Sequence, residues 1–208
     1  MTFVKICGIT NLEDASLAVD LGADMIGFNF YRGSKRYVSP KGTASIVEGL
    51  TEGITKVGVF VNATIGDILF ATKLAHLDSV QLHGNESPQF VAELRDRVET
   101  KIIKAIRVRS LSEISSLTGF RVDAILLDTY SATDFGGTGE TFDWQIARAG
   151  REKVDQLILA GGLSLENVAE AIRIVRPYAV DVASGVESSP RKKDPKKLEA
   201  FIRNAKNA

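Results

Sequence analysis

Short runs rich in Val, Ile, Leu and Phe alternate along this chain with segments that have the amphipathic pattern of helices. Eight runs are present: FVKIC (3–7), DMIGFNF (24–30), KVGVFV (56–61), SVQLH (79–83), KIIKAIRV (101–108), DAILLD (123–128), QLILA (156–160) and AVDVA (179–183). Strands that are joined through helices run parallel, and eight strand–helix units fit a chain of 208 residues. We therefore predict an α/β fold in which residues 1–208 form a single (β/α)8 TIM barrel, with an open doubly wound sheet as the alternative.

Residues suited to begin a helix precede several of the segments between these runs. A Ser or Thr three residues before a Glu has capping-box spacing, and a capping residue before Pro places that proline in the first helical turn. These patterns occur at Thr10 with Glu13, Ser110 with Glu113, Ser39-Pro40, Ser87-Pro88 and Asp194-Pro195. They predict helix starts at these places.

Polar residues occupy alternate positions near the ends of several runs. Successive strand side chains point to opposite faces, so Val4 and Ile6 share one face while Lys5 and Cys7 share the other. If the aliphatic faces pack against helices, the polar faces point into the barrel. The last inward positions then meet at the C-terminal mouth, where barrel enzymes keep their chemistry. Those positions are Cys7, Asn62, His83 and Asp128.

The same reasoning gives two further expectations about the barrel interior. The valines at 57, 59 and 61 face the helices, which leaves Gly58, Phe60 and Asn62 facing inward. Lys5 and Asp181 have inward phases on strands that become neighbours when the barrel closes. We expect them to form an ion pair, because an isolated buried ammonium group is costly.

Cys7 and Asp128 are the candidate base and acid. An unperturbed thiol is only slightly ionised at neutral pH, and the nearby Lys5 is expected to raise the thiolate fraction. An inward, partly desolvated Asp128 suits a general acid. The alternative interpretations are a buried filler cysteine and an aspartate that caps a loop or helix.

Three glycine-bearing turns follow the last three runs, at 135–139, 160–164 and 183–187. The turns after strands 7 and 8 form the usual phosphate site of this architecture, because glycine lets backbone N–H groups approach phosphate oxygens. A phosphorylated small-molecule substrate is therefore expected. The sequence contains neither a GxGxxG or Walker A motif nor a cluster of metal ligands, so we expect no nucleotide cofactor and no metal.

Cationic side chains gather in the loop YRGSKRYVSP (31–40) after the second run. They are either solvated loop charges or include an arginine that grips a substrate carboxylate in bidentate fashion. The second interpretation predicts an anionic, aromatic substrate end opposite the phosphate. Of the two histidines, His83 falls at the mouth, where it packs or contacts substrate, and His76 falls on an exposed helix face.

Charge and cysteine content narrow the classes of partner. Lys and Arg (26) balance Asp and Glu (26), so no net field favours nucleic acid or a membrane surface. The basic segment RKKDPKK (191–197) is interpreted as a solvated helix start. A lone cysteine and an N-terminus without signal features predict a cytoplasmic protein, and no run approaches the roughly 20 apolar residues of a membrane helix. The sequence allows a monomer or a homodimer.

Seven segments in chain order together resemble phosphoribosylanthranilate isomerase, an enzyme of tryptophan biosynthesis: VKICGIT, GFNFYRGSKRYVSP, VGVFVN, VQLHG, LLDTYSATDFGGTGETFDW, AGGL and DVASGVE. The resemblance implies an Amadori rearrangement of N-(5-phosphoribosyl)anthranilate to 1-(2-carboxyphenylamino)-1-deoxyribulose 5-phosphate without a cofactor. It implies that Asp128 protonates the ring oxygen and that Cys7 removes the C2 proton. The implied substrate-binding residues are Arg36 at the anthranilate carboxylate, Gly162, Ser184 and Gly185 at the phosphate, and in addition His83, Gly137 and Gly161.

Two positions depart from that family pattern. Ala183 stands where a serine is common, and Glu140 stands where a lysine is common. The first change removes a possible phosphate hydrogen bond, and the second puts an acidic group near the mouth. Related phosphosugar barrels of histidine or indole synthesis are alternatives, but their chemistry relies on two carboxylates or a lysine. A phosphate-binding barrel without catalysis would require Cys7 or Asp128 to point away from the mouth.

Overall fold

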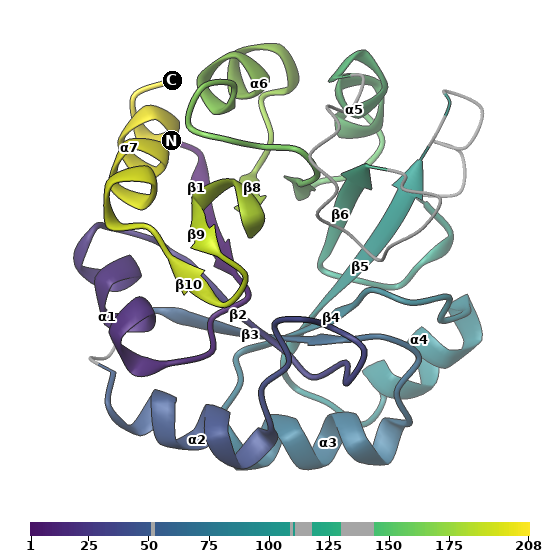
Figure 1. The fold of residues 1–208 in the computed structure, drawn as a ribbon. Helices are drawn as coiled ribbons and strands as arrows, with labels where there is room; N and C mark the ends of the chain where they lie inside the picture. The colour runs from purple at the N-terminus through teal and green to yellow at the C-terminus, as the bar shows by residue number, and fades with distance from the viewer. Residues whose placement is uncertain (51–52, 109, 111–117, 130–143) are drawn as a thin grey trace.

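The computed structural model describes residues 1–50, 53–108, 110, 118–129 and 144–208, and its strands close into one parallel barrel (Figure 1). Each strand pairs with its neighbours in chain order, and β1 also pairs with β8, which closes the ring. This closure confirms the predicted (β/α)8 barrel and rules out an open sheet. The barrel strands are β1 (Phe3–Cys7), β2 (Met25–Asn29), β3 (Thr55–Phe60), β4 (Ser79–Leu82), β5 (Lys101–Val108), β6 (Ala124–Thr129), β7 (Leu157–Leu159) and β8 (Ala179–Val182).

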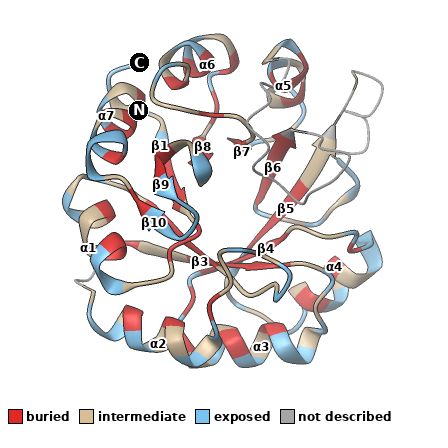
Figure 2. Ribbon diagram, in the orientation of Figure 1, coloured by how far each residue is buried: buried red, intermediate tan, exposed pale blue. Residues whose placement is uncertain are grey.

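Helices surround the barrel, with buried residues toward the strands and exposed residues toward solvent (Figure 2). Ser39, Ser87 and Asp194 cap helices whose first residue is proline, as predicted. Glu113 of the predicted start at Ser110 lies outside the described residues. The α-helices are α1 (Leu12–Asp20), α2 (Pro40–Glu48), α3 (Ile65–Leu74), α4 (Pro88–Arg95), α5 (Trp144–Arg151), α6 (Val168–Val175) and α7 (Pro195–Lys206).

The predicted cap of the first helix is wrong by one residue. Asn11, not Thr10, is the N-cap of α1, and its side chain accepts a hydrogen bond from the backbone N–H of Asp14 at 2.8 Å. Thr10 instead donates its hydroxyl to the backbone carbonyl of Arg191. A tertiary contact therefore takes the side chain that local spacing assigned to the cap.

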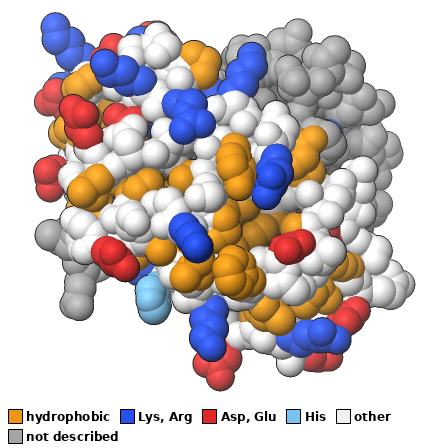
Figure 3. Space-filling view, turned by 60° about the horizontal axis from the view of Figure 1, so that its bottom comes forward, with side chains coloured by type: hydrophobic (Ala, Val, Ile, Leu, Met, Phe, Trp, Pro, Cys, Tyr) orange, Lys and Arg blue, Asp and Glu red, His pale blue; other side chains and the backbone are white. Residues whose placement is uncertain are grey.

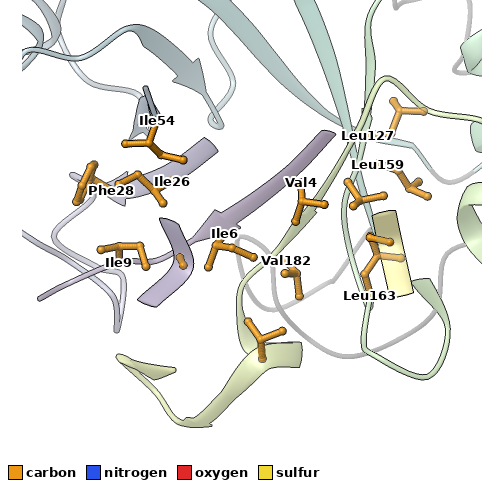
Figure 4. Close-up of a cluster of buried hydrophobic side chains, with 14 of the residues drawn as sticks. Val4, Ile6, Ile9, Ile26, Phe28, Ile54, Leu127, Leu159, Leu163 and Val182 are labelled. Carbon is orange, nitrogen blue, oxygen red and sulfur yellow. The ribbon is translucent and has the colours of Figure 1, made fainter. Parts of the chain in front are cut away.

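Two apolar layers fill the molecule. The outer layer lies between strands and helices and contains Val4 and Ile6, as expected (Figure 4). The inner layer fills the barrel and includes Val57, while Phe60 belongs to the outer layer. The predicted orientation of the third strand is therefore wrong, because its valines point inward. Both faces of a parallel strand are buried, so apolarity alone does not distinguish them.

A short extension follows β8 and closes over the end of β1. It consists of the 3-10 turn η2 (Ser184–Val186) and an antiparallel hairpin of β9 (Glu187–Ser189) and β10 (Lys192–Lys193), followed by α7. Figure 1 shows the hairpin and α7 beside β1, near the N-terminus. Asp194 begins a helix as expected, but Lys193 is only 2% exposed, so the basic segment is not a uniformly solvated one.

Surface charge follows the balanced composition. Lys and Arg side chains are scattered among Asp and Glu side chains on the face drawn in Figure 3. Among the described residues, no helix is long and apolar enough to cross a membrane. That part of the chain also holds no group of three or more His, Cys, Asp or Glu side chains arranged as metal ligands.

Candidate active site

A cavity of about 550 Å³ opens at the C-terminal ends of the strands. This volume lies in the range of small-molecule sites. Gly137 lies outside the described residues, and every other predicted site residue lines this cavity: Cys7, Arg36, His83, Asp128, Gly161, Gly162, Ser184 and Gly185. The sequence thus predicted the location of this group correctly.

Asn62 is the exception among the residues expected at the mouth, because it is not part of the cavity wall. Its side-chain oxygen accepts a hydrogen bond from the backbone N–H of Asn85 at 2.7 Å, and its own backbone has a φ of 50°. The valines of the third strand point into the barrel, so the alternate positions, which include Asn62, point away from it. Asn62 therefore links two loops instead of facing a substrate.

Cys7 ends β1 above a buried ion pair. Lys5 Nζ lies 3.0 Å from the Oδ1 atom of Asp181, which confirms the predicted pair. Burial raises the pKa of the Cys7 thiol above its ordinary value, although the positive charges of Lys5 and Lys193 oppose this rise. Desolvation is the larger effect, so the pKa of Cys7 is raised overall even though Lys5 favours the thiolate, as expected.

Gly27 on β2 keeps space for this cluster. A Cβ atom at this position would lie 2.9 Å from the sulfur of Cys7 and 3.0 Å from the ammonium of Lys5. Cys7 and Gly27 are direct partners in the pairing of β1 with β2. The thiol can occupy its place only because its neighbour lacks a side chain.

Asp128 near the end of β6 is 4% exposed and belongs to a chain of polar side chains. The Nε2 atom of His83 lies 3.1 Å from Asp128 Oδ2, and the amide nitrogen of Gln81 lies 2.9 Å from the Nδ1 atom of His83. An amide that donates to Nδ1 is compatible with a ring hydrogen on Nε2 that points to Asp128. His83 therefore contacts the candidate acid directly.

The glycine-bearing turns after β7 and β8 form one wall of the cavity. Gly161 and Gly162 have φ values of 83° and 63°, a conformation that glycine adopts without strain. The side chain of Asn167 holds this turn from both sides, since it donates to the carbonyl of Gly162 and accepts from the N–H of Ser164. The facing turn at Ser184 and Gly185 completes a wall suited to an anion.

Arg36 lies across the mouth, where Gly8 at the end of β1 leaves room for its side chain. Its Nε and Nη2 atoms donate to the two carboxylate oxygens of Glu187 at 2.8 and 2.6 Å. This hydrogen-bonded partner raises the pKa of Arg36, so the guanidinium stays charged. Glu187 in turn contacts the buried ammonium of Lys193.

Sequence reasoning missed three residues of this arrangement. Gln81 lies two positions before His83 and lines the cavity, but no role was predicted for it. Glu187 stands inside the quoted segment ASGVE, where only the glycine and serine drew notice. Lys193 was hidden in a run of basic residues, and its burial follows from the hairpin, which has no marked sequence signature.

Comparisons with known proteins agree with this geometry. The family model described as N-(5'phosphoribosyl)anthranilate (PRA) isomerase matches residues 4–204. A relative from Pelobacter propionicus with the name N-(5'-phosphoribosyl)anthranilate isomerase is 52% identical over 206 residues, which cover 99% of this chain and 96% of the relative.

Two solved structures extend the match to the whole fold. One, from Thermotoga maritima, is described as monomers generated from a dimeric phosphoribosylanthranilate isomerase; it is 42% identical, with a TM-score of 0.89. The other is the isomerase in complex with reduced 1-(o-carboxyphenylamino)-1-deoxyribulose 5-phosphate, 43% identical with a TM-score of 0.90. Each match covers all of both chains. By its sequence, its fold and the residues gathered at its mouth, this chain belongs to the phosphoribosylanthranilate isomerase family.

Proposed function

We propose that this protein converts N-(5-phosphoribosyl)anthranilate to 1-(2-carboxyphenylamino)-1-deoxyribulose 5-phosphate by acid–base catalysis without a cofactor. One observation carries the proposal: Cys7 and Asp128 line a single cavity that also contains an arginine and two glycine-bearing turns. The substrate has a carboxylate at one end and a phosphate at the other. The cavity offers a group for each end and a proton donor and acceptor between them.

The reaction divides into two proton transfers. Asp128 donates a proton to the furanose ring oxygen, and the bond between this oxygen and C1 breaks to give an iminium ion on the anthranilate nitrogen. Cys7 then takes the proton from C2. The electron pair of the broken C2–H bond forms the C1–C2 double bond and neutralises the iminium, which gives an enolamine. Protonation at C1 with loss of the C2 hydroxyl proton gives the ketone product, so the reaction is a net isomerisation.

The surroundings of the two groups suit these roles. A buried thiol binds its proton tightly, so the thiolate formed beside Lys5 is a strong base for a carbon acid. Asp128 on β6 is held by His83, which directly follows β4, two strands away round the barrel. A phosphate-binding barrel without catalysis would be favoured if Cys7 or Asp128 pointed away from the mouth. Both residues line the cavity, so this alternative has no support from their positions.

The deciding experiment follows the fluorescence of phosphoribosylanthranilate as it is consumed by wild type and by Cys7→Ser. We expect wild-type turnover and a loss on the order of 10²–10⁴-fold in kcat for the variant, as is usual when a general base is removed. Binding of the reduced product analogue should change little. Near-normal turnover by Cys7→Ser would eliminate Cys7 as the base.

Assembly and compartment are also proposed. Phe3 is 41% exposed and packs against Tyr178, with the two rings tilted by 45°, beside a second cavity, of about 270 Å³, at the N-terminal end of the barrel. An exposed phenylalanine beside a partly buried tyrosine favours a homodimer over a monomer, which sedimentation at micromolar concentration would decide. A base that must remain a free thiol favours the reducing cytoplasm, which cell fractionation would test.

A further inference from the structure

Lys193 is a buried cation that joins three segments at the edge of the mouth. Its side chain is fully buried, and its Nζ atom donates to the backbone carbonyl of Cys7 at 2.6 Å and to that of Ala183 at 3.1 Å. Its third acceptor is Glu187 Oε1 at 3.2 Å. A buried ammonium requires such partners, and here one of them is the backbone of the candidate base.

Glu187 links Lys193 to Arg36, because its carboxylate contacts both side chains. Its carboxylate accepts two hydrogen bonds from the Nε and Nη2 edge of the guanidinium. A guanidinium has five donor hydrogens, so the Nη1 and Nη2 edge retains hydrogens for a second carboxylate. Burial would raise the pKa of Glu187, but the hydrogen bond from Arg36 and the charges of Lys193 and Arg36 lower it, so the residue is anionic at neutral pH.

The charges explain why a third member is needed. A pair of Arg36 and Glu187 alone would have hydrogen-bond donors for a further carboxylate but no net charge to attract it. Burial lowers the pKa of Lys193, but its three hydrogen-bond acceptors suit an ammonium group, and as an ammonium it gives these three side chains one net positive charge beside the cavity, which matches one incoming carboxylate. A further carboxylate, that of Asp14, accepts the backbone N–H of Lys193 at 3.0 Å.

We propose that Glu187 and Lys193 are positioning residues that hold Arg36 with its Nη1 and Nη2 edge toward the substrate carboxylate and keep the cluster cationic. Through the carbonyl of Cys7, the same ammonium fixes the carboxylate clamp relative to the base. This proposal rests on the proposed function and deepens it, because it assigns the selectivity for a carboxylate-bearing ring to residues outside the reacting pair.

The test compares two ligands that are not turned over. One is reduced 1-(o-carboxyphenylamino)-1-deoxyribulose 5-phosphate, and the other is the same compound without the ring carboxylate. Dissociation constants are measured by calorimetry for wild type, Glu187→Gln and Lys193→Met. We expect wild type to prefer the carboxylate compound, and each variant to lose about tenfold or more of that preference while its affinity for the second compound stays within about twofold.

A matched control exists in the same chain. Glu86 and Lys104 form another buried pair, 2.8 Å apart, in which the lysine also donates to two backbone carbonyls. Glu86→Gln and Lys104→Met should lower the melting temperature comparably and leave the preference for the carboxylate unchanged. An equal loss of preference in these variants would mean that general destabilisation, not positioning, is being measured.

Several outcomes would overturn the proposal. They are an unchanged preference in folded Glu187→Gln, an equal loss of affinity for both compounds, and no preference in wild type. If Lys193→Met does not fold, Glu187→Gln decides alone, since glutamine preserves the shape of glutamate. The dissociation constants are measured without turnover. A wild type that failed to convert phosphoribosylanthranilate would therefore refute the proposed function, and the binding test could still be interpreted.

Discussion

The Nε2 atom of His83 lies 3.1 Å from the Oδ2 atom of Asp128, while the Gln81 amide nitrogen lies 2.9 Å from its Nδ1 atom. The imidazole is thus held between a fixed donor and the candidate acid. His83 and Asp128 are 45 positions apart in the chain. The relationship makes His83 a positioning residue for proton transfer.

Replacement of His83 by asparagine should therefore lower kcat more than it raises KM. We expect a loss on the order of 10-fold to 100-fold, because the candidate acid loses the hydrogen bond that holds it in place. His76→Asn is the matched control, because His76 is exposed and has a φ of 48°, which asparagine tolerates. Steady-state kinetics on both variants would contradict this role if they gave the same kcat.

The ionisation of Cys7 gives a prediction about pH. Iodoacetamide reacts with the thiolate, and Cys7 is the only cysteine of the chain, so the site of modification is known. Burial raises the pKa of this thiol, so its thiolate fraction below that pKa is smaller than in a free cysteine. We expect the alkylation rate to keep rising with pH beyond about 8.5, where a free thiol is half ionised.

The same measurement isolates the contribution of Lys5. The double substitution Lys5→Met with Asp181→Asn removes the ion pair without leaving either charge buried alone. Lys5 lowers the pKa of Cys7 more strongly than Asp181 raises it, so loss of both should move the midpoint of alkylation to a higher pH. A midpoint that moved to a lower pH would show that Asp181 dominates the environment of the thiol.

The sequence predicted most of the barrel because parallel strands and their helices have distinct patterns. Alternation within each strand also placed Cys7, His83 and Asp128 correctly, since polar residues mark the inward face near the mouth. The same reasoning failed for Val57 and Phe60. Both faces of that strand are apolar, and only packing against the other strands and helices decides which one faces inward.

The ionic cluster beyond the barrel could not be predicted. Arg36 and Glu187 are 151 positions apart, and their contact depends on how the hairpin after β8 folds back over β1. Lys193 is buried while neighbouring Lys192 is exposed, a difference set by strand alternation in a two-residue strand. No local signal separates two such lysines, so a basic run that looked solvated contains a structural cation.

Arg36 should determine the affinity for the substrate carboxylate. Arg36→Met removes the hydrogen-bond donors while preserving much of the side-chain volume, and we expect KM to rise about tenfold or more with a smaller change in kcat. Arg32 is exposed in the same loop, with its guanidinium carbon 6.0 Å from the ring centre of Tyr37. Arg32→Met should leave KM within about twofold, and equal effects of the two substitutions would contradict an individual role for Arg36.

Adding a single methyl group at Gly185 should weaken phosphate binding, if the turn at this residue forms the proposed phosphate site. A Cβ atom at Gly185 would collide with the backbone carbonyl oxygen of Leu163, so Gly185→Ala must push apart the two turns that form this wall. We expect weaker competitive inhibition by inorganic phosphate and a raised KM, with the barrel still folded. Gly66→Ala in α3 is the control, because its only close neighbour would lie 3.8 Å away. Unchanged phosphate inhibition in Gly185→Ala would place the phosphate site elsewhere.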